Sequence, residues 1–201
     1  MPRRSQRDRS ESTRAALVST ARRLFGERGY PSVPAEEVVS QAGVTRGALY
    51  HHYADKRSLF RAVFEELESE ISAAVGAVLA AAPDRRAGLA GAVETLLDLC
   101  QRPDVVRIVL TDAPAVLGWQ EWREIERRHG LRLIVDILQD AAEAGTIPAA
   151  AVPTLAQLIL SALTEAALIV AHATDPRAAR VQAEQALLTL LAGLLPDPTG
   201  A

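Results

Sequence analysis

Residues 29–57 read GYPSVPAEEVVSQAGVTRGALYHHYADKR, and this stretch decides the fold of the chain. It contains two short helical patterns joined by Ala42, Gly43 and Val44. A glycine just past the end of a helix readily adopts the left-handed backbone that residues with side chains disfavour. Thr45 follows this turn, and its hydroxyl can cap the second helix. The pattern predicts a helix-turn-helix.

The second helix of this motif has two chemically different sides. Leu49 and Tyr53 recur at helical spacing, which places them with Ala48 on the side that faces the core. The opposite side carries groups that can hydrogen-bond to DNA or allow its close approach: Arg46, Gly47, Tyr50 and His51. An arginine reads guanine through two parallel hydrogen bonds, and a helix enters the major groove. We therefore interpret this segment as a DNA-recognition helix.

The basic pair that follows, Lys56 and Arg57, lies in an unusual place. Asp55 is a good N-cap, so both cations fall in the first turn of the next helix. Positive charge there opposes the helix dipole. A phosphate would remove the conflict, because helix N-termini and lysines bind anions. We predict that Lys56 anchors the DNA backbone; the alternative is a solvated lysine without a partner.

The motif closely resembles the DNA-binding domain of the TetR family of bacterial one-component regulators. The resemblance covers the first third of the chain and depends on residues whose spacing is kept: Leu24, Phe25, Gly29, Tyr30, the run 43–53, Lys56, Leu59 and Phe60. It implies a homodimer that binds a palindromic operator, represses transcription, and is released by a small ligand in a variable C-terminal domain.

The resemblance also implies roles for single residues. Those matching Arg46, Gly47 and Tyr50 commonly reach bases in the family. Those matching four others commonly reach phosphates: Thr45, His51, His52 and Lys56. The chain departs from the family at Pro34, where a serine or threonine usually caps the first helix and touches a phosphate. That contact is therefore either absent or made by Ser32.

The charge distribution agrees with a nucleic-acid-binding head. The chain of 201 residues has a net charge of −3, but residues 1–60 carry a net +5 and residues 61–201 a net −8. A basic N-terminal part and an acidic remainder suit binding to DNA through one end only. We expect a flexible basic arm over 1–9, a helix-turn-helix domain over 10–56, and a helical regulatory and dimerisation domain over 57–201.

Hydrophobic periodicity predicts an all-α protein with a three-helix N-terminal DNA-binding domain and a C-terminal helical ligand-binding and dimerisation domain. The first helix is expected over about 10–27, with one apolar stripe, and Gly26 and Gly29 are expected to end it. A long helix over about 55–82 would link the two domains. Five further helices are expected near 86–101, 104–117, 119–144, 153–173 and 176–195.

The last two predicted helices are the most apolar and are expected to form a homodimer. Their stripes exceed what one small domain needs to cover, and a four-helix interface between two copies would bury the excess. The expected interface residues are Leu155, Leu158, Ala162, Ala166, Ile169, Leu187, Leu191 and Leu194. A purely internal hairpin is one alternative. A membrane span over 155–173 is another, but Glu165 and neighbouring polar residues interrupt it.

The residue pattern of the central helices indicates a ligand pocket only weakly. Two tryptophans lie near polar groups in an otherwise aromatic-poor region, and such a set can line an apolar pocket. The candidates are Thr111, Asp112, Trp119, Trp122, His129 and Glu165. The alternative is that the tryptophans only pack a helix against its neighbour.

Other classes of function find little support in the sequence. The single cysteine, Cys100, allows no internal disulfide, and no apolar leader is visible, so a cytoplasmic location is expected. His51, His52 and Asp55 do not complete a metal site, and no catalytic or cofactor motif stands out. We therefore expect neither an enzyme nor a cofactor. The main alternative function is a helical small-molecule-binding or scaffolding protein without DNA affinity.

Overall fold

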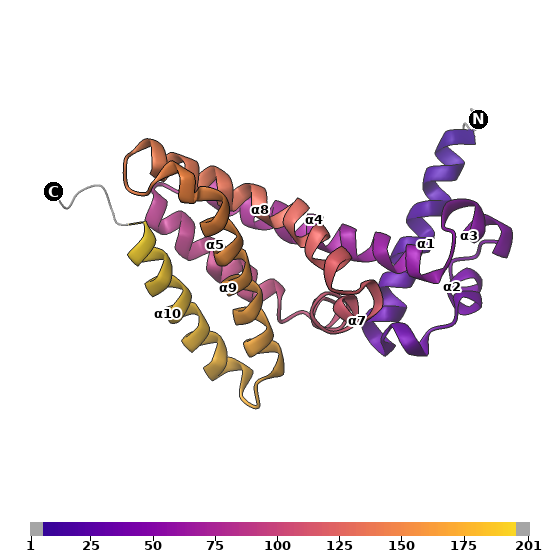
Figure 1. The fold of residues 1–201 in the computed structure, drawn as a ribbon. Coiled ribbons are helices and arrows are strands. Elements are labelled where there is room, and N and C mark those ends of the chain that lie inside the picture. Colours follow the sequence, from indigo (N-terminus) through magenta and orange to yellow (C-terminus); the bar gives the residue numbers. More distant parts are fainter. Residues whose placement is uncertain (1–5, 196–201) are drawn as a thin grey trace. The chain divides into compact units, whose positions relative to one another are not determined.

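A computed structural model describes residues 6–195, and every regular element in this range is helical (Figure 1). The elements of the first part are α1 (Gln6–Arg28), the 3-10 turn η1 (Tyr30–Ser32), α2 (Ala35–Gln41), α3 (Arg46–His52) and α4 (Lys56–Ala81). The others are α5 (Arg85–Leu99), α6 (Pro103–Val105), the π-helix η2 (Val106–Asp112), α7 (Ala113–Leu117), α8 (Trp119–Glu143), the 3-10 turn η3 (Ala149–Ala151), α9 (Val152–His172) and α10 (Pro176–Leu194). The predicted all-α class is confirmed.

The long helices follow the sequence pattern closely. The helices expected over 55–82, 119–144, 153–173 and 176–195 are α4, α8, α9 and α10, with each end displaced by at most one residue. Asp84 and Asp175 cap α5 and α10 by accepting hydrogen bonds from the first-turn N–H groups of these helices. Local capping and apolar periodicity therefore suffice to define these elements.

The chain forms two compact units. Unit 1 comprises Met1–Leu67 and Pro103–Trp122, and unit 2 comprises Glu68–Arg102 and Arg123–Ala201. The boundary crosses the long helices α4 and α8. This division differs from the boundary expected at residue 56, because residues 103–122 pack with the N-terminal helices.

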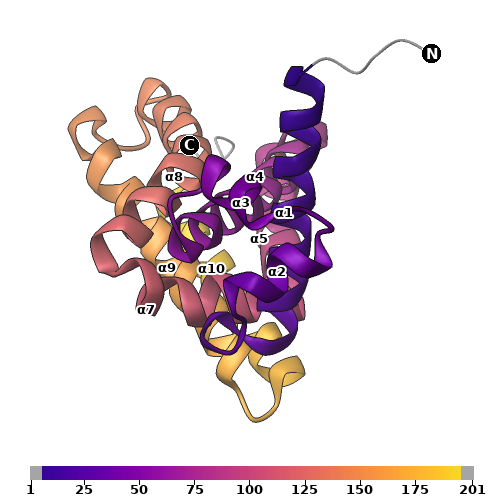
Figure 2. The same cartoon turned by 90° about the vertical axis from the view of Figure 1, so that its right-hand side faces the viewer.

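In unit 1, α1 is the central element. It packs against α2, α3, α6 and η2, and Figure 2 shows the short α2 and α3 beside it. The predicted apolar stripe is confirmed, because Leu17, Ala21, Leu24 and Phe25 are almost completely buried. Phe60 of α4 meets Phe25 with ring centroids 5.6 Å apart. This core holds the helix-turn-helix.

The start of α1 corrects the expected basic arm. The helix begins at Gln6, so residues 6–9 are helical and do not belong to an arm without regular structure. Arg7 pairs with Glu11 one turn later, at 3.1 Å between Nε and Oε1. Such i, i+4 ion pairs stabilise a helix, and apolar periodicity, on which the prediction depended, does not detect them. Residues 1–5 of the expected arm lie outside the described part of the chain.

Gly26 lies inside α1 and does not end it. Its role is close packing, since a Cβ at this position would lie 3.0 Å from Cβ and 3.2 Å from Cα of Asp104. Asp104 also accepts hydrogen bonds from Nε and Nη2 of Arg22, at 3.0 and 2.9 Å. Gly29, with φ +79°, is the residue that ends the helix. The absence of a side chain at Gly26 thus lets α6 dock onto α1.

The predicted regular helix over 104–117 is interrupted. Residues 106–112 form a π-helix, and the N–H of Ala113 bonds to the carbonyl of Ile108, five residues back. Pro114 follows immediately. A proline lacks an N–H and its ring excludes the carbonyl four residues earlier, so the wider turn before Pro114 accommodates it.

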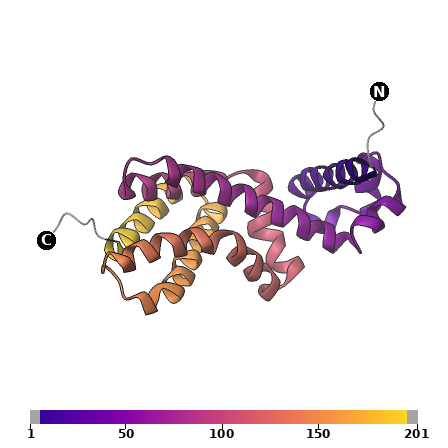
Figure 3. The same cartoon turned by 90° about the horizontal axis from the view of Figure 1, so that it is seen from above.

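Unit 2 is a bundle of helices around an apolar core. Helices α9 and α10 lie side by side, and both contact α5 (Figures 1 and 3). Helix α8 adds Ile134, Leu138 and Ala141 to the same core. The core also contains residues from the other three helices: Val93, Leu97, Ala156, Ile159, Leu160, Ala166, Val170, Ala183, Leu187 and Leu191.

Candidate nucleic-acid interface

The turn between α2 and α3 has the predicted geometry. Gly43 has φ +66°, and Thr45 Oγ1 accepts a hydrogen bond of 3.1 Å from the N–H of Ala48. Pro34 is the N-cap of α2, and among the described residues its position supplies no capping hydrogen bond from a side chain. Because Pro34 stands where the family usually has a serine or threonine, α2 lacks a side-chain cap at this position. Ser32 is exposed nearby, and its predicted contact with a phosphate stays a prediction.

The inner side of α3 is anchored as expected. Leu49 is 1% exposed and Tyr53 is 7% exposed. The Tyr53 hydroxyl accepts a hydrogen bond of 3.3 Å from Nε of Arg14 on α1. Because two buried side chains and one hydrogen bond hold this side, the opposite side of the helix has a fixed orientation within unit 1.

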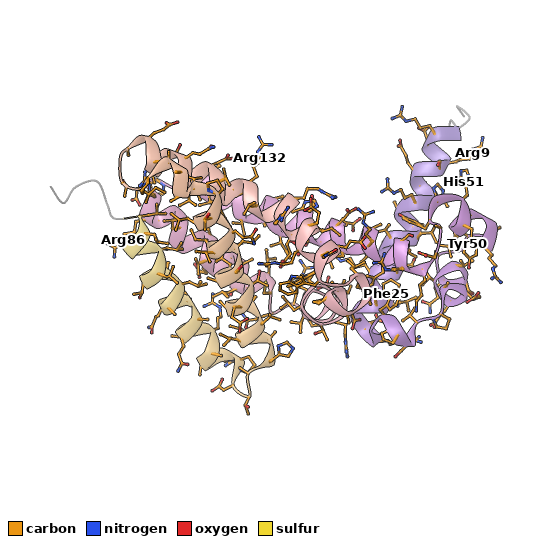
Figure 4. The ribbon with its side chains drawn as sticks, viewed as in Figure 1. Arg9, Phe25, Tyr50, His51, Arg86 and Arg132 are labelled. Carbon is orange, nitrogen blue, oxygen red and sulfur yellow. The ribbon has the colours of Figure 1, made fainter. Side chains whose placement is uncertain are left out.

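The outer side of α3 carries the predicted DNA-reading groups. Thr45, Arg46, Gly47, Tyr50 and His51 are all exposed, and Figure 4 shows Tyr50 and His51 on α3 away from the buried Phe25. The Arg46 guanidinium lies over the Tyr50 ring, 5.6 Å from its centroid, and Nη1 lies 3.7 Å from Oε1 of Glu36. Because both partners are exposed and the contacts are long, the guanidinium remains available to a base edge.

His52 differs from its neighbour His51. It is partly buried, its ring lies 5.1 Å from that of His51, and Arg14 lies near it. Burial, then the charges of His51 and Arg14, lower the pKa of His52 below its usual value. In the protein without DNA this lowered pKa favours the neutral imidazole, and the predicted phosphate contact of His52 stays a prediction.

Lys56 has partners within the protein, which rules out the alternative of a solvated lysine, and its predicted contact with a phosphate stays a prediction. Its Nζ donates to the main-chain carbonyls of Tyr30 and Val33, at 2.9 and 3.0 Å, and lies 3.9 Å from the centre of the Tyr30 ring. Burial lowers the pKa of this ammonium. Lys56 is therefore not a solvated lysine without a partner, because it holds the loop between α1 and α2. An ammonium has three donors, so one remains for a phosphate.

Lys56 is the only lysine in the chain, where the other basic side chains are arginines. The three groups around its ammonium favour a lysine over an arginine at this position. Two carbonyls and a ring face surround one compact charge, whereas an arginine presents a flat fork of donors. The next residue, Arg57, donates instead to the carbonyls of Val116 and Leu117 at the end of α7, at 3.1 and 2.9 Å. Both cations of the first turn thus have main-chain acceptors.

Tyr30 connects three parts of unit 1, and sequence reasoning gave it no such role. Its N–H donates to Oδ2 of Asp112 at 2.7 Å, and its ring packs against Phe25 and Phe60 at centroid distances of 5.6 and 5.0 Å. Asp112, at the end of the π-helix, is 8% exposed. The hydrogen bond joins residues 82 positions apart, and no local sequence pattern predicts such a pair.

Of the six candidate pocket residues, four belong to unit 1 and two to unit 2. Thr111 donates to the carbonyl of Val106 at 2.8 Å, and Asp112 binds Tyr30. Both tryptophans lie in unit 1, with ring centroids 5.0 Å apart; Trp122 is buried and Trp119 is 65% exposed. His129 is partly buried and Glu165 is exposed in unit 2. Asp112, Thr111 and the tryptophans therefore have structural contacts, and their predicted role in a pocket stays a prediction.

The expected dimer residues divide into exposed and buried ones. Leu158 and Ile169 are 60% and 52% exposed, and Leu155, Ala162 and Leu194 are partly buried. Three others are corrected, because they lie in the core of unit 2: Ala166, Leu187 and Leu191. Apolar periodicity finds inward and outward apolar residues alike, so it could not separate the two groups.

Comparison with known proteins agrees with the geometry of both parts. Residues 17–63 match the model for bacterial regulatory proteins of the tetR family, and residues 86–194 match a tetracyclin repressor-like C-terminal domain. The Transposon Tn10 TetC protein of Escherichia coli is 30% identical over 120 residues, which cover 60% of this chain and 60% of TetC.

Solved structures show the same likeness. The crystal structure of a TetR-family transcriptional regulator from Pectobacterium atrosepticum is 36% identical, with a TM-score of 0.82, and the match covers 96% of this chain and 100% of that one. RolR in complex with resorcinol shares the fold, with a TM-score of 0.71 at 20% identity over 98% of this chain and 99% of RolR.

Proposed function

This chain belongs to the TetR family of DNA-binding transcriptional regulators, and from this premise we propose that it is a homodimeric repressor that binds a palindromic operator in the cytoplasm and is released by a small ligand. The observation that carries the DNA-binding part is the outer side of α3. There Arg46, Gly47, Tyr50 and His51 are exposed on a helix whose opposite side is anchored by Leu49 and Tyr53.

We assign the contacts by chemistry. Arg46 and Tyr50 reach base edges, and Gly47 allows the backbone to approach closely. Phosphates are bound by hydroxyl, imidazole and ammonium groups around the motif: Thr45, His51, His52, Ser32 and the third donor of Lys56. Selecting genomic fragments that bind the purified protein tests the proposal. If no fragment binds better than random DNA, the scaffolding or small-molecule-binding alternative is favoured.

Replacing Arg46 by alanine should cost about 1–3 kcal/mol of operator binding and relax preference at one base pair. The reason is the loss of a two-pronged donor that matches guanine. The free energy of unfolding should stay within about 0.5 kcal/mol, since the side chain is 69% exposed. Fluorescence anisotropy with the selected operator and with a random duplex of equal length measures the effect.

Arg46→Lys is the matched control, because it keeps the charge and removes the fork. We expect it to retain binding to random DNA while losing most of the sequence preference. Equal losses on operator and random DNA for Arg46→Ala would mean that Arg46 contacts only the backbone.

The homodimer is supported by the exposed face of α9. Leu158, Ala162, Glu165 and Ile169 recur at helical spacing and share this face. Exposed apolar residues that gather on one face, rather than lying singly, mark an interaction surface. By length and composition Ala149–His172 also fits a membrane span, but α9 packs with α5 and α10 and carries Glu165 within that face. A second copy therefore covers the face better than lipid does.

Release by a ligand is the remaining part of the proposal. RolR, which shares the fold, has been solved with resorcinol. In this chain the ligand would bind among the helices of unit 2, and α4 and α8 run from that unit into unit 1. A coupling of about 1–3 kcal/mol would lower operator affinity by about 5- to 150-fold. Operator binding with and without a ligand at saturation measures this coupling.

A further inference from the structure

Glu36, the second residue of α2, is an acidic group beside the arginine of the recognition helix. Helices α2 and α3 pack against each other, and Oε1 of Glu36 lies 3.7 Å from Nη1 of Arg46. The two side chains are 62% and 69% exposed. Their separation allows an ion pair but is too long for a hydrogen bond. A carboxylate of α2 therefore lies next to the guanidinium to which we assign base reading.

Arg46 thus has one partner on each of the two helices of the motif. The second partner is Tyr50, one turn later on α3 (Figure 4), whose ring centroid lies 5.6 Å from the guanidinium carbon. The carboxylate and the ring together restrict where the guanidinium lies before DNA binds. Because an arginine reads guanine with a planar fork, its orientation decides whether both hydrogen bonds form. Helix α2 therefore contributes to the aim of a group that α3 carries.

The helix dipole does not by itself explain an acid at position 36. An acid in the first turn of a helix is favourable, and α2 has two, Glu36 and Glu37. Glu37 accepts hydrogen bonds from Nη1 of Arg28 at 2.6 Å and from Nε2 of Gln41 at 3.0 Å, so it also ties α2 to α1. Glu37 already supplies the favourable charge. The carboxylate beside Arg46 calls for a further reason.

A carboxylate in this position is unfavourable for binding to DNA in general. Affinity for random DNA comes from cations that replace the counterions of phosphates. Glu36 offsets the charge of Arg46 and repels a phosphate that approaches the guanidinium. A guanine instead offers two uncharged acceptors, O6 and N7, which take two of the five N–H donors of an arginine. The other donors keep the carboxylate as a partner, so Glu36 disfavours the phosphate contact more than the guanine contact.

We propose that Glu36 is a specificity-determining residue, whose carboxylate aims Arg46 at a guanine and prevents the guanidinium from binding the phosphates of random DNA. The inference rests on the DNA-binding function proposed above and names a residue outside the recognition helix that sets its selectivity. Discrimination between two partners depends on repulsive groups as well as attractive ones. Here α2 supplies the repulsive group and α3 the attractive one.

Glu36→Gln removes the charge and keeps the length of the side chain. We expect its affinity for a random duplex to rise about five- to tenfold at about 100 mM salt, because one more cation takes part in counterion release. Affinity for the selected operator should change by less than about twofold, since weaker repulsion and a less well aimed Arg46 offset each other. The preference for guanine at the base pair read by Arg46 should therefore fall.

Fluorescence anisotropy with both duplexes over a series of salt concentrations measures these changes. On random DNA, the slope of log affinity against log salt concentration should become steeper by about 0.9 in Glu36→Gln. On the operator the slope should stay the same, because Arg46 contacts a base there. Glu36→Asp keeps the charge, so its affinity for random DNA should stay as weak as that of the wild type.

Glu27→Gln is the matched control for the change of charge. Glu27 forms an exposed ion pair of the same kind with Arg23, at 3.2 Å between Oε2 and Nη1. Arg23 also donates to Gln41, the last residue of α2, so this pair lies at the opposite end of α2 from Glu36. At this distance salt screens the charge from the DNA. We expect the ratio of operator affinity to random-DNA affinity to match that of the wild type.

A double-mutant cycle with Arg46→Ala separates the proposed role from a general effect on the fold. Without the guanidinium, Glu36 has nothing to aim, so adding Glu36→Gln should raise the affinity for operator and random DNA equally. In the wild-type background the same change should lower the affinity ratio. An effect on the structure of α2 alone would change the ratio alike in both backgrounds. Circular dichroism confirms that each variant keeps its helix content.

Two results would overturn this inference and leave the proposed function intact. One is an unchanged affinity of Glu36→Gln for random DNA, and the other is an equal rise on operator and random DNA. A wild-type protein that prefers no genomic fragment over random DNA would instead overturn the proposed function, and the role of Glu36 with it.

Discussion

Replacing Lys56 by methionine is expected to lower the free energy of unfolding of unit 1 by about 3 kcal/mol and to weaken binding to every DNA sequence alike. The methionine keeps the aliphatic stem but removes the ammonium. The carbonyls of Tyr30 and Val33 lose their donor, and the Tyr30 ring loses a cation 3.9 Å from its centre. The loop between α1 and α2, which sets the approach to the helix-turn-helix, should loosen.

Urea unfolding followed by tryptophan fluorescence measures this loss, because both tryptophans belong to unit 1. Lys56→Arg is the informative companion. It preserves the charge but not the compact geometry, so it should be destabilised as well. If Lys56→Arg is as stable as the wild type, then charge alone matters at this position. If Lys56→Met loses DNA affinity but no stability, then Lys56 acts only as a phosphate anchor.

Replacing Leu158 by aspartate is expected to convert the proposed dimer to a monomer and to abolish operator binding at nanomolar concentrations. Burying a leucine contributes about 1.5–3 kcal/mol. A two-fold symmetric interface contains the residue twice, so the loss is about 3–6 kcal/mol, or at least a hundredfold in the dimer dissociation constant. Adding a charge to the buried face increases the loss further.

The monomer itself should remain folded, because Leu158 is 60% exposed in the single chain. Light scattering gives the mass, and circular dichroism checks the helix content. Gln139→Asp, an equally acidic change at an exposed position of α8, is the control and should stay dimeric. A Leu158→Asp protein that keeps the mass of a dimer would show that the face of α9 around Leu158 does not form the interface.

Local signals in the sequence accounted for most of the fold. The turn at Gly43, the cap at Thr45 and the inward side chains of Leu49 and Tyr53 were predicted and confirmed, because each depends on residues within one or two turns of the chain. The same holds for the ends of α4, α8, α9 and α10. The outer groups of α3 followed by exclusion once its inner side was known.

The incorrect predictions share one cause, which is a contact with a residue distant in sequence. The sequence predicts a helix end at Gly26, but this glycine lies inside α1 and makes room for Asp104. The alternative of a solvated Lys56 without a partner is wrong, because its ammonium donates to the carbonyls of Tyr30 and Val33. Ala166 and its buried companions were assigned to the dimer, because periodicity marks an apolar side without saying which neighbour covers it.

By itself, the sequence determined the helices, the turn and the chemical character of the outer side of α3. These depend on backbone preferences and on periodicity, which act over a few residues. Only the tertiary structure decided that Asp112 binds the N–H of Tyr30, 82 residues away, and that Glu126 accepts hydrogen bonds from Arg123 and Thr164. Whether a polar group is satisfied depends on which helices meet around it, and packing sets that for the whole chain at once.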